Sequence, residues 1–151
     1  MRFAGAAAME TVQRTFAGKN PEAAIYTRKE ADGIVLLAAS PHRLVLYVRG
    51  AIGTEHIVGA LREARAGGHF QNDDFSALVD MRDFTGVIDW RIIPQISEVM
   101  PKGDSRTNRN AYLVRNALFA MLAKINAVLF PKTQHATFDR EEDARHWLGW
   151  A

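Results

Sequence analysis

Acidic and hydroxyl side chains crowd the stretch ALVDMRDFTGVIDW, residues 77–90, directly after an apolar run. Asp80 and Asp83 are spaced to act as general acid and base, or to supply oxygen ligands to Mg²⁺. Such chemistry is expected at the carboxyl end of a strand in an α/β sheet. The simpler alternative is turn chemistry, because Asp and Thr side chains bond nearby backbone amides. The candidate switch or ligand loop contains Asp80, Asp83, Thr85 and Asp89.

A second candidate site is the polar loop of residues 101–110. Its basic side chains can bind a phosphate or the acidic surface of a partner. Asp104 partly cancels this charge, so a solvated loop is the alternative interpretation. The candidate anion-binding residues are Lys102, Arg106 and Arg109.

The segment of residues 117–130 is predicted to be a helix that is apolar around most of its circumference. A surface helix normally shows a wider polar face. Either the helix is deeply buried, or its extra apolar face lines a pocket or a dimer interface. The candidate pocket or interface residues are Phe119, Met121, Ala123 and Phe130.

Other catalytic and cofactor patterns are missing from the sequence. There is no cysteine, so disulfides and thiolate chemistry are excluded. The five histidines form no H-x-H or HExxH pattern, and there is no GxGxxG or Walker loop. We therefore expect no metal, no cofactor and no catalytic constellation, and interpret the chain as a binding protein rather than an enzyme.

Composition bounds the remaining possibilities. The 151 residues, 48% apolar and 24% charged, suit one globular domain. A net charge of +2 argues against nucleic-acid binding. No apolar run is long enough to cross a bilayer, and the first residues do not resemble a secretory signal, so we expect a cytoplasmic protein. Residues 1–20 are predicted to be an N-terminal extension outside the core fold, with the domain spanning residues 21–151.

Apolar periodicity and turn residues predict the order of the elements. Strands are expected over residues 24–29, 33–40, 43–50, 75–81, 110–116 and 135–138, and helices over 54–66, 89–101, 117–130 and 140–150. The last helix has Asp139 and Glu142 spaced as a capping box. After an opening hairpin, strands alternate with helices, which implies parallel crossovers. The sequence thus predicts an α/β fold with a mixed, mostly parallel sheet flanked by helices.

The closing segment TFDREEDARHWL resembles the SpoIIAA-like proteins related to STAS domains. Its matching residues are Phe138, Asp139, Glu141, Glu142, Ala144, Trp147 and Leu148. A second match is the apolar strand to Asp80, followed nine residues later by Asp89. The resemblance covers the chain from about Ala24 onward.

The resemblance implies a domain that binds proteins, nucleotides or small ligands and is generally not catalytic. In the anti-sigma-factor antagonists, a serine beside an acidic residue at the start of the following helix is phosphorylated. Here Trp90 and Arg91 follow Asp89, so that serine is missing. We therefore expect a regulatory or binding module that recognises a protein partner or small ligand. The module is expected to be able to form a homodimer. The alternatives are a carrier of a lipid or other apolar molecule, and an enzyme using Asp80 and Asp83.

Overall fold

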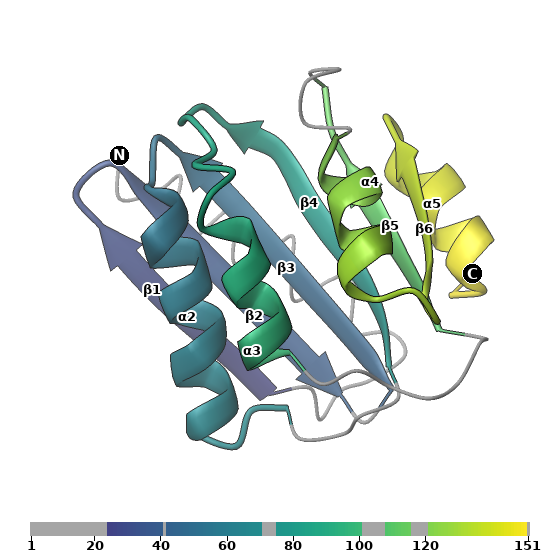
Figure 1. Ribbon diagram of the computed structural model, residues 1–151, viewed down its shortest axis with the longest axis horizontal. Helices are drawn as coiled ribbons and strands as arrows, with labels where there is room; N and C mark the ends of the chain where they lie inside the picture. The colour runs from purple at the N-terminus through teal and green to yellow at the C-terminus, as the bar shows by residue number, and fades with distance from the viewer. Residues whose placement is uncertain (1–23, 41, 71–74, 101–107, 116–120, 151) are drawn as a thin grey trace.

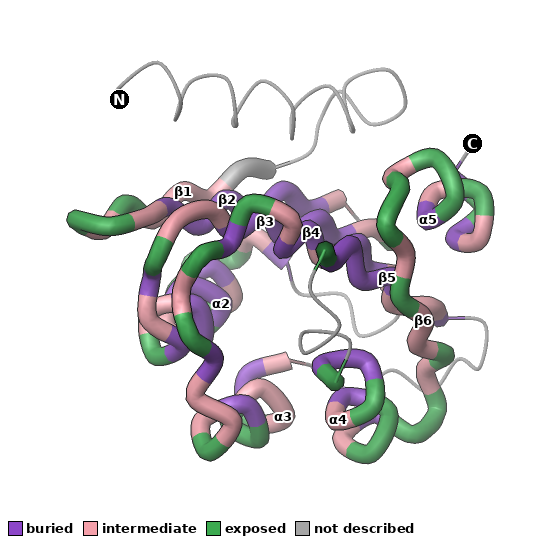
Figure 2. The backbone as a smooth tube through the Cα atoms, turned by 90° about the horizontal axis from the view of Figure 1, so that it is seen from above, coloured by how far each residue is buried: buried purple, intermediate pink, exposed green. Residues whose placement is uncertain are grey.

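The computed structural model describes residues 24–40, 42–70, 75–100, 108–115 and 121–150. Six strands form one sheet with helices on both faces (Figures 1 and 2). In chain order the elements are β1 (Ala24–Glu30), β2 (Gly33–Ser40), β3 (Arg43–Gly50), α2 (Thr54–Ala66), β4 (Ser76–Phe84), the 3₁₀ helix η1 (Ile93–Gln95), α3 (Ile96–Val99), β5 (Arg109–Leu113), α4 (Met121–Leu129), β6 (Gln134–Phe138) and α5 (Glu141–Leu148). The predicted extension, residues 1–20, lies outside the described residues.

The first three strands form an antiparallel meander, as the two apolar runs and the turn between them predict. Leu36 and Leu37 point to opposite faces of β2, and both are fully buried. Gly50 ends β3 in the left-handed region with φ +82°, where an added Cβ would lie 2.3 Å from the carbonyl oxygen of Asp32. Only glycine fits this corner without strain.

The second half of the chain adds parallel strands, and the strand order is β1-β2-β3-β4-β5-β6. All three crossovers place their helices on one face of the sheet, as expected when every crossover has the same hand (Figure 2). We call this side, covered by α2, α3 and α4, the three-helix face. The expected α/β fold, with a mixed and mostly parallel sheet and an opening hairpin, is confirmed.

The opposite side of the sheet is the α5 face, because α5 packs there against β4, β5 and β6. Each face carries its own apolar core. Val35, Leu46 and Val48 belong to the core on the three-helix face. Leu36, Ala144 and Leu148 belong to the core on the α5 face. Strands buried on both sides explain why β2 and β3 are continuous apolar runs rather than alternating ones.

Three details differ from the sequence prediction. β4 does not end near Asp80 but continues to Phe84, because its pairing with β3 continues to Gly50. The second helix is reduced to η1 and α3, with Pro94 in the first turn of η1. The last helix has Arg140 at its N-cap and no side-chain cap, so the Asp139–Glu142 capping box is wrong.

No helix in the described part of the chain combines the length and apolarity needed to cross a membrane.

Candidate functional site

A β-bulge decides where the acidic residues of β4 point. Tyr47 pairs with Asp80, and Arg49 pairs with Asp83, so β4 contains one extra residue between these two pairs. The extra residue shifts the alternation of the strand. Met81 and Phe84 therefore both lie in the core of the three-helix face. Asp80 and Asp83 are both turned to the α5 face.

Asp80 is 5% exposed and is held by Arg82, two residues further along β4. Arg82 donates from Nε to Oδ1 at 3.0 Å and from Nη2 to Oδ2 at 2.8 Å, and its backbone N–H donates to Oδ1 at 3.1 Å. These hydrogen bonds raise the pKa of Arg82. Glu141 of α5 lies 3.5 Å from the same guanidinium. This arrangement is a structural ion pair that joins the sheet to α5.

Asp83 accepts a hydrogen bond from the hydroxyl of Tyr47. Burial and this hydrogen bond raise the pKa of Tyr47. Asp80 and Asp83 therefore have separate partners, Arg82 for Asp80 and Tyr47 for Asp83. No three described His, Asp or Glu side chains lie close enough to hold a metal ion.

The rest of the candidate switch loop is organised around Asp89 and Thr54. The backbone N–H of Asp89 donates to Oγ1 of Thr54 at 2.8 Å. Its carboxylate accepts from the backbone and the guanidinium of Arg91, which lowers the pKa of Asp89. Asp89 therefore closes a turn before η1 and does not cap a helix. Thr85 is exposed, and its backbone N–H donates to Gly50.

Of the candidate anion-binding residues, Lys102 and Arg106 lie outside the described residues. The guanidinium of Arg109 lies 5.3 Å from the ring centroid of Trp147 and donates to the Trp147 carbonyl. In this position Arg109 stabilises the packing of the end of α5 against β5.

Of the predicted apolar helix, residues 117–130, the structure describes the part that forms α4. Phe119 lies outside the described residues. Ala123 and Phe130 are buried, whereas Met121 is 44% exposed. Met121 and Val128, which is 79% exposed, are seven residues apart and share the outer side of α4. The helix is therefore neither wholly buried nor uniformly exposed. Its inner side meets a cavity.

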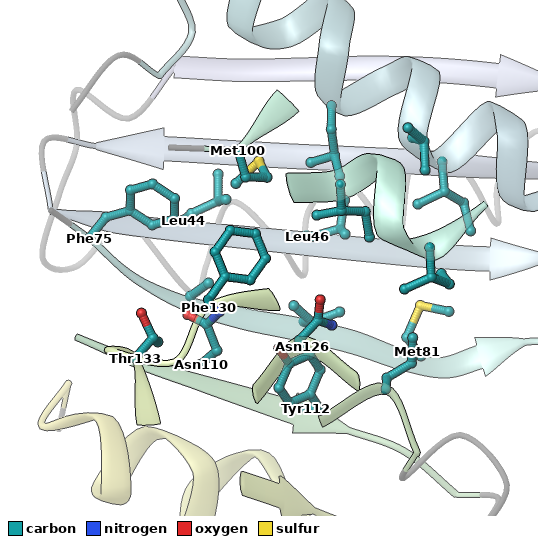
Figure 3. Close-up of a pocket in the computed structure, with 18 of the residues that line it drawn as sticks. Leu44, Leu46, Phe75, Met81, Met100, Asn110, Tyr112, Asn126, Phe130 and Thr133 are labelled. Carbon is teal, nitrogen blue, oxygen red and sulfur yellow. The ribbon is translucent and has the colours of Figure 1, made fainter. Parts of the chain in front are cut away.

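This cavity of about 110 Å³ lies between the sheet and the helices of the three-helix face (Figure 3). The sheet supplies its floor, including Leu44, Leu46, Ala77, Val79, Met81 and Tyr112. The helices and the loop before η1 supply its roof, including Ile57, Leu61, Ile88, Ile93, Ile96, Leu122 and Phe130. Apolar walls and a small number of polar groups are typical of small-molecule sites.

Apart from Thr54 of α2, the polar groups gather where β5, β6 and α4 meet. The hydroxyl of Tyr112 lies 3.0 Å from Nδ1 of His135, and Nε2 of His135 lies 3.2 Å from the carbonyl oxygen of Phe130. Burial raises the pKa of Tyr112, while side-chain hydrogen bonds from Asn110 and Asn126 act in the opposite direction. Burial also lowers the pKa of His135.

This chain of hydrogen bonds has one consistent direction. A carbonyl oxygen only accepts, so Nε2 of His135 carries the hydrogen, and the neutral ring accepts at Nδ1. Tyr112 therefore donates its hydrogen to His135. Its oxygen then accepts from the amide NH₂ group of Asn126, which turns the Asn126 carbonyl oxygen away from Tyr112.

A solved structure is among the proteins to which the chain is similar. It is an uncharacterised protein of the DUF3478 family with a SpoIIAA-like fold, from Shewanella loihica PV-4. The match covers 83% of this chain and 93% of that chain, with 18% sequence identity and a TM-score of 0.47. No family model and no curated protein matches the chain.

Sequence reasoning missed the polar cluster of Asn110, Tyr112, Asn126 and His135. One signal was available for Asn126, because Leu122, Asn126 and Phe130 are spaced four residues apart and so share one side of the helix. A lone amide on an apolar helix face needs a buried partner or a ligand. No comparable signal links Tyr112 to His135, since their contact depends on the pairing of β5 with β6.

Proposed function

We propose that this domain is a non-catalytic binding module whose ligand is a small, mostly apolar molecule held in the cavity of the three-helix face. The observation that supports this is the cavity itself, which combines apolar walls with a polar cluster at one end. The side chains that could suggest catalysis, Asp80 and Asp83, are turned to the opposite face and are already paired.

The volume limits the size of the ligand. An engineered apolar cavity of about 150 Å³ binds benzene, and pockets for drug-sized ligands measure about 300–1,000 Å³. A cavity of about 110 Å³ therefore suits a small ring, a short branched chain, or one apolar group of a larger molecule. The whole acyl chain of a lipid requires more room, so we favour a small ligand over a lipid carrier.

The position of the cavity also offers a route to regulation. Ile88 forms part of its roof, and Asp89 next to it is fixed to Thr54 of α2. Thr54 lines the same cavity. A ligand beneath Ile88 would therefore stabilise the loop that carries Asp89, next to the position where the anti-sigma-factor antagonists carry their phosphorylated serine. This coupling needs no phosphorylated serine.

The proposal is tested with toluene as a probe and with a variant that fills the cavity. Ala77 points into the cavity from β4, so Ala77→Leu should occupy the space and abolish saturable toluene binding measured by NMR titration. The free energy of unfolding of the wild-type protein should rise by about 2.7 kcal/mol at a toluene concentration of about 100 times Kd. That gain corresponds to roughly 5–10 °C in melting temperature.

The matched control is Ala66→Leu, the same substitution at the exposed end of α2. It should leave toluene binding intact. Absence of saturable binding by the wild-type protein, or equal binding by Ala77→Leu and wild type, contradicts the proposed function. Native mass spectrometry of freshly purified protein gives an independent test, because a natural ligand that co-purifies adds a defined mass that Ala77→Leu should lack.

A further inference from the structure

One buried acceptor in the cavity is left without a partner. Asn126 is 6% exposed, and its Oδ1 makes no hydrogen bond to the protein. Asn126 lines the cavity from α4, and Figure 3 shows it beside Tyr112 and among apolar side chains. A buried carbonyl oxygen without a partner is unfavourable, and most such groups in native proteins are satisfied.

The surrounding network prevents Asn126 from correcting this by rotating its amide. Tyr112 uses its only hydrogen on Nδ1 of His135, because Nε2 of that ring donates to the carbonyl oxygen of Phe130. If Asn126 turned Oδ1 toward Tyr112, two acceptors would face each other. The network therefore holds the NH₂ group against Tyr112 and presents Oδ1 as a fixed acceptor.

From this geometry we infer that the ligand of the cavity carries a neutral hydrogen-bond donor, a hydroxyl or an N–H group, that binds Oδ1 of Asn126 while its apolar body fills the rest of the space. The inference rests on the proposed function and narrows the ligand class. The donor is neutral because no acidic side chain among the described residues lines the cavity to balance a cation.

Purely apolar molecules of the same size should then bind measurably but more weakly than molecules with a donor, because they leave Oδ1 unsatisfied. A site built to bond a polar group discriminates strongly against an analogue that lacks it. Asn126 is thus a specificity-determining residue, and Tyr112 and His135 are positioning residues that act through it.

The test compares phenol, aniline and toluene, which have similar shapes and the same number of non-hydrogen atoms. Phenol and aniline carry a donor, as hydroxyl and N–H respectively, and toluene carries none. The measured quantity is the ratio of the toluene Kd to the phenol Kd. In Asn126→Leu, which removes the acceptor and keeps an apolar side chain, this ratio should fall roughly tenfold. The corresponding aniline ratio shows whether an N–H donor serves as well as a hydroxyl.

Phe130→Leu is the matched control, since it alters the cavity wall one helical turn away without changing its polarity. It should change the affinity of both probes and leave their ratio within about twofold of wild type, because the acceptor is intact. In wild-type protein, phenol should shift the side-chain amide resonances of Asn126 more than toluene does, because a hydrogen bond to Oδ1 adds to the ring-current shift that both molecules cause. This readout requires no variant to fold.

The outcomes separate the two proposals. If all three probes bind saturably and the toluene-to-phenol ratio is the same in wild type and Asn126→Leu, the donor inference is wrong and the binding module remains. If no probe binds the wild-type protein, the proposed function fails first. A fall in the ratio together with a larger shift at Asn126 for phenol than for toluene supports both.

Discussion

Tyr112 and His135 are joined side chain to side chain across the β5–β6 pair, with the tyrosine hydroxyl 3.0 Å from Nδ1 of the imidazole. Their rings are also stacked, with centroids 6.0 Å apart. The pair connects the last parallel strand to the polar end of the cavity, so its loss should affect both stability and the geometry of the site.

Tyr112→Phe should lower the free energy of unfolding by about 1–3 kcal/mol, because it leaves Nδ1 of His135 and the amide of Asn126 without a partner in a buried site. Urea denaturation measures this loss. Tyr26→Phe removes a similar tyrosine–side-chain bond, from Tyr26 to Glu63 at the surface, and should have little effect. Equal effects of the two substitutions would argue against a buried network around Tyr112.

The stability of the protein should fall as the pH drops below about 6.5, the ordinary pKa of histidine. Burial lowers the pKa of His135 in the folded state, so between the two pKa values the unfolded chain binds more protons than the native one. Stability from this group is complete above the unfolded pKa and is lost as the pH falls through the folded pKa. Comparing urea denaturation of wild type and His135→Gln at about pH 7.5 and about pH 5.5 isolates this contribution.

His135→Gln should be less stable than wild type near pH 7.5, and this difference should narrow at the lower pH. The exposed residue His146 provides the control for the substitution itself, because His146→Gln removes no buried contact and should have little effect on stability near pH 7.5. A difference between wild type and His135→Gln that does not change with pH would show that His135 does not titrate in this window.

Asp80 and Asp89 offer a matched pair of ion pairs with the same local geometry and different burial. Each carboxylate accepts from the backbone and guanidinium of the arginine two residues later. The side chain of Arg82 is 23% exposed and that of Arg91 is 90% exposed. Asp80→Ala should lower the free energy of unfolding by about 2–3 kcal/mol. This loss is smaller than for a fully buried ion pair, because the remaining Arg82 side chain still contacts solvent and Glu141.

Asp89→Ala should lower the free energy of unfolding far less, with both variants compared by urea denaturation. Because Asp80 is turned to the α5 face, Asp80→Ala should also leave toluene binding unchanged under conditions where the variant is folded. Loss of a measurable turnover or of metal binding on replacing Asp80, with stability intact, would instead favour the enzyme alternative.

Arg109→Lys tests whether Arg109 acts by its shape or by its charge. Lysine keeps the positive charge but loses the planar group that lies over Trp147, so stability should fall by about 1 kcal/mol. Arg115→Lys, at an exposed position after β5, is the control and should be neutral. If Arg109→Lys is as stable as wild type, and Arg109→Ala weakens phosphate binding in an NMR titration, the anion-binding interpretation is favoured.

The order of strands and helices was predictable because local patterns determine it. The apolar runs of β2 and β3 and the turn between them are visible in the sequence, and so are the glycines after α2. The end of β4 was not predictable, since the strand continues past Asp80 only through pairing with β3 and a bulge within that pairing. A bulge is a property of two strands, and neither sequence segment alone contains it.

The site was less predictable than the fold for the same reason. Phe130 could be selected from the apolarity of its helix, and it does line the cavity. The acidic residues that seemed most suited to chemistry are turned to the other face, where they form ion pairs and hydrogen bonds. Asn126 gains its importance from what Tyr112 and His135 do, and these two side chains meet only when β5 and β6 are paired.

The sequential strand order also has a consequence for how the chain folds. Every strand pairs only with its neighbours along the chain, so each ladder closes a short loop and costs little closure entropy. During synthesis the β1–β3 meander can form first, and each parallel strand then adds at one growing edge after a single crossover. The cavity of the three-helix face is completed late, because its polar end belongs to the final strand pair. Nascent chains should therefore form the first strands of the sheet before the cavity is complete.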